Sequence, residues 1–303
     1  MGIALRQSSR AAEDLFQLAE DVTDLPLRKL CEEGPLSELT RTSVAQIGVV
    51  VVSLAAAIHL DDMLGRKPEA IAVAGHSVGE LAAYCWAGAL DAETAIRLVH
   101  RRGQLMERDS SQVDGTMVAV LNLDAEALLS VCTQASAQTG STVQVANLNA
   151  PGQVVLSGER TAIAAASELA TAAGARRVIQ LTVGGPFHSR YMEPAARDFA
   201  DAIGHADFHQ PHTPIVLNTT AAATTDVEAL RGELVTQITN PVRWEDSLQA
   251  LARLGCTTFI ELGPGQVLTG LVRRTLPEAG AVSAGTPEEV ESIVQQLAGM
   301  ASH

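Results

Sequence analysis

The sharpest chemical signal in the sequence is a serine that lies between two glycines. Residues 75–79 read Gly-His-Ser-Val-Gly, which follows an apolar run and precedes a helical stretch. This G-x-S-x-G form between a strand and a helix is typical of a nucleophile elbow. The helix start behind the serine favours negative charge on a tetrahedral intermediate. We therefore predict that Ser77 is a nucleophile and that the Val78 N–H is the first oxyanion donor.

A serine nucleophile needs a base, which is normally a histidine, and the sequence holds eight histidines. His76 lies in the elbow itself and faces away from the serine oxygen. Five more lie within helices or in a loop that lacks the HExxH pattern of a zinc site. These five are His59, His100, His205, His209 and His212, and the eighth histidine, His303, is the terminal residue. His188 follows a predicted strand at its C-terminal end, where catalytic loops gather in open α/β sheets, so we predict that it is the base.

The usual third member of such a site is a carboxylate between the serine and the histidine in the chain. No acidic residue between Ser77 and His188 lies at an evident sheet end. The sequence therefore favours a Ser–His dyad whose imidazole is held by a backbone or amide oxygen.

The elements that must position these residues alternate between strands and helices. Strands are expected at 70–74, 214–220 and 257–262, and the first should be buried on both faces because it is wholly apolar. Long helices are expected at 42–64 and 91–108. Such alternation predicts a parallel sheet that is covered on both faces by helices.

The pattern changes at Gly115 and returns after residue 183. Residues 115–183 read as β-α-β-β-α-β, the order of a ferredoxin-like module. The predicted fold class is therefore α/β, with an α/β-hydrolase-like, parallel-sheet large subdomain and an inserted ferredoxin-like small subdomain. The large subdomain should comprise residues 1–114 plus 184–303.

Composition excludes several function classes. The chain has 303 residues, a formal net charge of −14 and 47% apolar residues. An acidic chain is a poor match for duplex nucleic acid or an anionic membrane. The longest apolar run, 44–58, is too short to span a bilayer, and no secretory signal is visible. The four cysteines form no CxxC pair, so we expect reduced thiols and a cytoplasmic protein.

These motifs together resemble the malonyl-CoA:acyl-carrier-protein transacylases of fatty-acid and polyketide synthesis, from about residue 2 to about residue 276. Residues 75–80 match the nucleophile motif of that family. Arg102 matches the arginine that pairs with the free carboxylate of the malonyl group. The residue type agrees, because a guanidinium grips a carboxylate through two parallel bonds and keeps its charge.

Other parts of the resemblance surround the predicted base. His188, in residues 185–189, matches the catalytic histidine, and Gln237 matches the residue whose main-chain oxygen orients it. Asn149 lies in a segment, 149–155, that matches a loop facing the site. Residues 263–265 match the C-terminal glycine-rich block.

The resemblance implies malonyl transfer from malonyl-CoA to the phosphopantetheine thiol of an acyl carrier protein by a monomer. It implies no metal and no tightly bound cofactor, since both thiol arms are substrates. Substrate binding would fall to Arg102, His76, Asn149 and Phe187; Phe187 and Val78 suit a small pocket. Four arginines match basic positions that meet the carrier protein. These are Arg176, Arg177, Arg273 and Arg274.

One departure from the family concerns the start of the chain. The family opens with a strand ending in Gly-Gln-Gly-Ser, whose glutamine N–H is the second oxyanion donor, whereas this chain begins at Met1 beyond that turn. Either a strand precedes Met1 in the natural product, which we expect, or a central strand and a donor are missing. Two rivals stay open: an acyl hydrolase that clears carrier proteins, and an inactive paralogue that only binds them.

Overall fold

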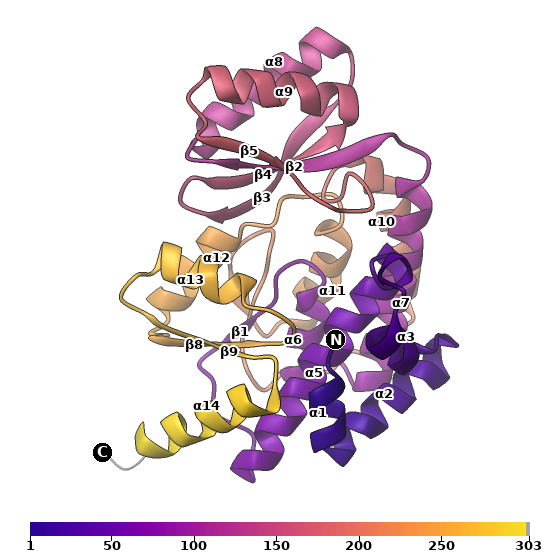
Figure 1. The fold of residues 1–303 in the computed structure, drawn as a ribbon, viewed down its shortest axis with the longest axis vertical. Coiled ribbons are helices and arrows are strands. Elements are labelled where there is room, and N and C mark those ends of the chain that lie inside the picture. Colours follow the sequence, from indigo (N-terminus) through magenta and orange to yellow (C-terminus); the bar gives the residue numbers. More distant parts are fainter. Residues whose placement is uncertain (301–303) are drawn as a thin grey trace.

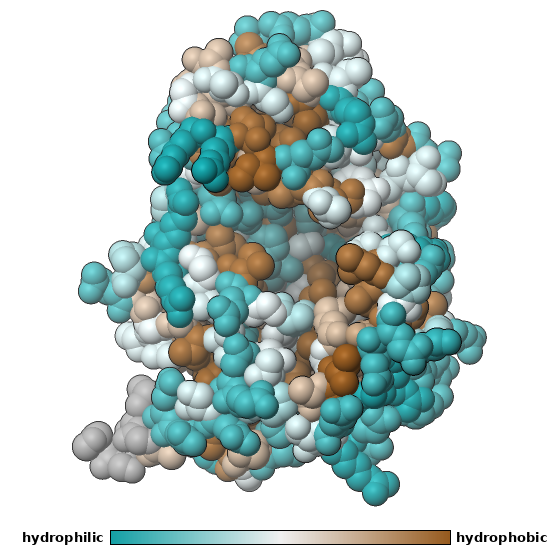
Figure 2. Space-filling model, in the orientation of Figure 1, coloured by the Kyte–Doolittle hydropathy of each residue, from teal (hydrophilic) through white to brown (hydrophobic). Residues whose placement is uncertain are grey.

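The computed structural model describes residues 1–300. Figure 1 shows two structural units, each with its own β-structure. We call residues 115–180 the small unit and the rest the large unit. The small unit lies over one side of the large unit in Figure 1. The face drawn in Figure 2 is hollowed between the two units.

The small unit has the order β-α-β-β-α-β that the sequence predicts. Its elements are β2 (Gly115–Leu121), α8 (Ala125–Thr139), β3 (Val143–Ala150), β4 (Gln153–Glu159), α9 (Arg160–Ala172) and β5 (Arg177–Gln180). The strands form an antiparallel sheet in the order β3-β4-β2-β5. Both helices cover one face of this sheet (Figure 1), where Val120, Leu128 and Leu156 are fully buried. On the other face, Met117 and Val155 pack with Phe187. The subdomain limits at 114 and 183 stay a prediction.

The large unit holds two small sheets with parallel strand pairs, which confirms the α/β fold. β1 (Val73–Ala74) pairs in parallel with β6 (Ile215–Val216), and β7 (Ala223–Thr224) adds an antiparallel partner. The second sheet pairs β8 (Thr258–Leu262) in parallel with β9 (Gly280–Ala284).

Two strand predictions are too long. The strand expected at 70–74 is only β1, and it is half-buried rather than buried on both faces; Ile71 is 53% exposed. The reason is that, within residues 1–300, β1 has a strand partner on one side only. The strand expected at 214–220 ends at Val216 because the chain turns there: the Ala221 N–H donates to Leu217 O.

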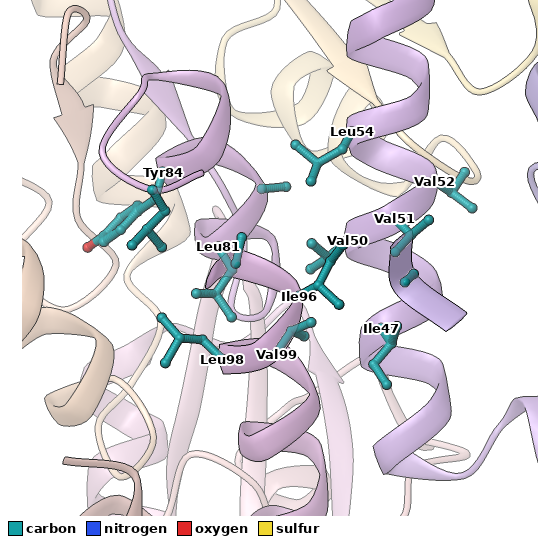
Figure 3. Packing of buried hydrophobic residues seen from close by; sticks show 14 of the residues in the cluster. Ile47, Val50, Val51, Val52, Leu54, Leu81, Tyr84, Ile96, Leu98 and Val99 are labelled. Carbon is teal, nitrogen blue, oxygen red and sulfur yellow. The ribbon is translucent and has the colours of Figure 1, made fainter. Parts of the chain in front are cut away.

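Helix α5 (Thr42–Leu64) forms the centre of the large unit. It is apolar on all sides, as expected of a helix surrounded by core. Figure 3 shows Val50 and Leu54 of α5 near Leu81 of α6 (Gly79–Trp86) and Val99 of α7 (Ala92–Ser110). α5 is the one described helix long and apolar enough to cross a membrane, but 78% of its most apolar window is buried inside the protein.

The remaining helices surround this core and the two parallel sheets (Figure 1). They are α1 (Ile3–Ser8), α2 (Arg10–Thr23), α3 (Leu27–Glu33), α4 (Leu36–Leu39), the 3-10 turn η1 (Arg190–Met192), α10 (Glu193–Gly204), α11 (Val227–Thr236), α12 (Trp244–Arg253), α13 (Val267–Thr275) and α14 (Pro287–Met300).

Candidate active site

The serine turn is held open by tight backbone packing and by one asparagine. Ser77 has a φ of 52°, in the left-handed region that non-glycine residues rarely adopt. A Cβ on Gly75 would lie 2.1 Å from the Gly79 carbonyl carbon, so only glycine fits there. Asn218, two residues after β6, accepts the Ser77 N–H at 2.7 Å and donates to Gly75 O at 2.7 Å. Asn218 therefore fixes the strained conformation that presents Ser77.

The serine and the predicted base are in direct contact. Ser77 Oγ lies 2.7 Å from His188 Nε2, and His188 Nδ1 lies 2.8 Å from Gln237 O. Because a carbonyl oxygen only accepts, Nδ1 carries the proton and Nε2 is free to accept from the serine hydroxyl. No described carboxylate bonds this imidazole; the backbone oxygen of Gln237 takes that place.

The electrostatics of the site keep His188 neutral. Burial and, to a smaller extent, the nearby positive charge of Arg102 lower the pKa of His188 to about 3. His188 is 3% exposed. A neutral imidazole with a free Nε2 is the form that a general base requires.

The low pKa of His188 predicts an unusual pH profile. An ordinary histidine protonates near pH 6.5 and would lose its base function below that value. Since the lowered pKa keeps His188 neutral, the rate of serine acylation should stay level from about pH 7.5 to about pH 5. The measurement is the acylation rate at sub-saturating acyl-CoA, which reports the free enzyme. An acid limb centred near pH 6.5 would contradict this environment for His188.

Arg102 is a buried cation beside the nucleophile. It is 2% exposed, and burial lowers its pKa to about 10. It donates from Nη1 to Gln46 Oε1 at 2.6 Å, and from Nη2 to Gln237 Oε1 at 2.9 Å and Ser77 Oγ at 3.2 Å. Within the described residues it forms no ion pair with a carboxylate. A buried charge without a counter-ion at contact is suited to an anionic ligand.

Gln46 is a site residue that the sequence analysis missed. It lies on α5, and its oxygen reaches Arg102 of α7 because the two helices approach closely at Gly103. A Cβ on Gly103 would lie 2.9 Å from Ser43 Cα. The signal for this residue in the sequence was a glutamine inside the mostly apolar run 44–58. A polar residue on a buried helix needs partners, and here its oxygen accepts from Arg102 while its Nε2 donates to Met106 Sδ.

The other predicted site residues line the contact between the units. His76 Nε2 lies 2.8 Å from Asn149 Oδ1 of β3, and its ring packs edge-on against Trp244 with centroids 5.3 Å apart. Burial lowers the pKa of His76. Phe187 lies between the cores of both units. The structure thus brings His76, Asn149 and Phe187 to one region, although their substrate contacts stay a prediction.

The Val78 N–H is available as an oxyanion donor. Within residues 1–300 it donates to no protein acceptor, unlike the N–H groups of Ser77, Gly79 and Glu80. The role of this N–H, the second donor and the strand expected before Met1 stay predictions.

Within residues 1–300, no cluster of three or more His, Cys, Asp or Glu side chains could hold a metal. The expected lack of any cofactor stays a prediction.

Comparison with known proteins places this arrangement in a family. Residues 1–298 match the family model described as "Acyl transferase domain". The chain is 38% identical over 297 residues to the malonyl CoA-acyl carrier protein transacylase of Bacillus subtilis, covering 98% of this chain and 92% of that one.

Solved structures agree with the sequence match. The malonyl CoA-acyl carrier protein transacylase of Coxiella burnetii superposes with a TM-score of 0.93 at 31% identity, over 98% of this chain and 93% of that one. A malonyl-transacylase solved in complex with its type II polyketide synthase acyl-carrier protein superposes with a TM-score of 0.92 at 33% identity, over 97% of this chain and 94% of that one. The chain belongs to the acyl transferase domain family and is an acyltransferase.

Proposed function

We propose that this protein transfers a malonyl group from malonyl-CoA to the phosphopantetheine thiol of an acyl carrier protein. The observation that carries the proposal is the buried Arg102, which lies 3.2 Å from Ser77 Oγ and has no carboxylate at contact among the described residues. An acyl group with a distal carboxylate supplies that missing partner. The names of the relatives support the same substrates for this chain.

The first half-reaction loads the serine. The Ser77 hydroxyl gives its proton to His188 Nε2, and Oγ attacks the thioester carbonyl while Arg102 binds the distal carboxylate. The Val78 N–H stabilises the oxyanion. The carbon–sulfur bond then breaks, and protonated His188 gives its proton to the departing CoA sulfur.

The second half-reaction unloads the serine. The carrier thiol gives its proton to His188, and its sulfur attacks the seryl ester carbonyl. When the ester carbon–oxygen bond breaks, His188 returns the proton to Ser77 Oγ. Each half-reaction therefore leaves His188 neutral, which suits its strongly lowered pKa.

Reconstitution with malonyl-CoA and a holo acyl carrier protein tests the proposal. The expected result is malonyl-carrier protein, detected by mass, that forms at the rate at which CoA is released. Free malonate in its place would establish a hydrolase. Neither product, with intact binding of the carrier protein, would establish an inactive paralogue. Either outcome would overturn the proposed function.

The carrier protein should meet local basic patches, since both partners are acidic overall. The four predicted arginines are exposed, and two of them also hold backbone oxygens: Arg273 donates to Ala281 O and Arg274 to Pro151 O. We expect charge reversal at Arg176 and Arg177 to raise the KM for the carrier protein and to weaken its dependence on salt. Loading from malonyl-CoA should not change. A steady-state assay with varied carrier protein checks this, and an unchanged KM would remove the pair from the interface.

A further inference from the structure

Glu80 is a fully buried carboxylate that the mechanism above does not use. It lies on the first turn of α6, three residues after the nucleophile, and is 0% exposed. One oxygen accepts the Asn218 N–H at 2.7 Å, and the other accepts Gln237 Nε2 at 2.5 Å. Both oxygens therefore accept N–H groups, which is the pattern of an ionised carboxylate. Burying this charge beside the active site is costly unless it is compensated.

The side chain of Gln237 connects Glu80 to the guanidinium. Its Oε1 accepts from Arg102 at 2.9 Å, and its Nε2 donates to Glu80 and, at 3.0 Å, to Ser77 O. An arginine can only donate and an ionised carboxylate can only accept. The amide between them therefore has one favourable orientation, with its oxygen toward Arg102 and its NH₂ group toward Glu80. Together, Glu80 and Arg102 thus fix which end of the amide faces the guanidinium.

The same path lets the buried charges compensate each other. Within residues 1–300, the side-chain hydrogen bonds of Arg102 all go to neutral side chains: Gln46, Ser77 and Gln237. Burial and the nearby Glu233 raise the pKa of Glu80 well above its usual range, whereas the N–H groups of Asn218 and Gln237 and the charge of Arg102 oppose that rise. Because both carboxylate oxygens accept N–H groups, these contacts favour the ionised form. The arginine is thus neutralised at a distance, through an amide, while its contact position for a carboxylate stays open.

We propose that Glu80 is a positioning residue: acting through the side chain of Gln237, it holds Arg102 in the geometry that selects acyl groups with a distal carboxylate. The inference rests on the proposed function and adds a selectivity role to it. The Gln237 side chain acts independently of its backbone oxygen, which holds His188.

Two opposite effects follow from removing the Glu80 charge. The direct electrostatic effect would make Arg102 a better partner for malonyl, since a competing negative charge is gone. The orientational effect would let the Gln237 amide turn its NH₂ group toward the guanidinium and displace it. We expect the second to dominate, because a glutamine at position 80 has only one oxygen for the two N–H groups that Glu80 accepts, from Asn218 and Gln237. The charge, by contrast, acts only across the intervening amide.

The experiment compares malonyl and acetyl loading of Ser77 by intact mass. In E80Q, the ratio of malonyl to acetyl loading rates should fall about 10- to 100-fold, as for loss of a hydrogen bond to a charged group. Q237M, which keeps the backbone oxygen, should lower the ratio similarly. The double variant should be no worse than the poorer single variant, because both substitutions interrupt one path.

Glu233 provides the matched control. It is a second buried glutamate of the same region, but its carboxylate accepts from Thr219, from the N–H at 2.8 Å and from the hydroxyl, and not from the side chain of Gln237. E233Q should leave the malonyl-to-acetyl ratio within about twofold of the parent, even if it lowers the melting temperature. An unchanged or raised ratio in E80Q, or equal losses of both acyl groups, would overturn the inference. Absence of any serine adduct in the parent protein would instead overturn the proposed function.

Discussion

Replacing Arg102 with alanine should lower the rate of malonyl loading by about 30-fold to several thousand-fold, which corresponds to the 2–5 kcal/mol cost of truncating one partner of a buried charge pair. Acetyl loading should be spared or improved, since an acetyl group has no distal carboxylate to bind. The measurement is the rate of each adduct on Ser77 after rapid quenching and intact-mass analysis.

Arg101 is the control for this variant. It lies next to Arg102 on α7 but is exposed to solvent, so R101A should load both acyl groups at the parental rates. Equal losses of malonyl and acetyl loading in R102A would contradict the role of Arg102 as a carboxylate partner and would indicate a general loss of site structure.

His188→Ala should slow loading and transfer alike, by about 10²- to 10⁴-fold, because the same imidazole moves the proton in both half-reactions. Its direct bond to Ser77 Oγ, at 2.7 Å, is the structural basis for this expectation. Single-turnover loading from malonyl-CoA, followed by addition of the carrier protein, measures the two steps separately.

His100→Ala is the corresponding control. His100 lies on α7 and bonds Gln104 at the surface rather than any residue of the site, so its loss should change neither step. Rates for H188A within a few-fold of the parent would mean that another group acts as the base.

The reacting residues could be predicted from sequence because their signals are local. The elbow motif at 75–79 combines the serine, the glycines and the helix start within five positions, and His188 follows a predicted strand. The roles of the residues that were missed have no such signal: Gln46 is marked only as a glutamine in an apolar run, and Glu80 only as the last position of the matched motif. Gln46, Glu80 and Asn218 act only through contacts with segments at least 56 positions away in the chain, such as the Gln46–Arg102 bond. Such contacts become visible only when the fold brings the segments together.

The same distinction holds for the fold. The small unit was predictable because strand alternation and turn residues mark each of its elements, from β2 to β5. In the large unit, strand length depends on pairing that the sequence does not encode locally. Residues 70–72 are apolar but unpaired, and β6 ends where the chain turns at Leu217. The C-terminal β9 and α14 were not predicted at all.

The most direct test of the whole account is the intact mass of the protein after brief exposure to malonyl-CoA without a carrier protein. The account predicts a mass increase of one malonyl group, mapped by peptide analysis to Ser77, absent from S77A and removed when a holo acyl carrier protein is added. An adduct that persists in S77A, or a parent protein whose mass does not change while malonyl-carrier protein still forms, would contradict the seryl ester on which the proposed reaction depends.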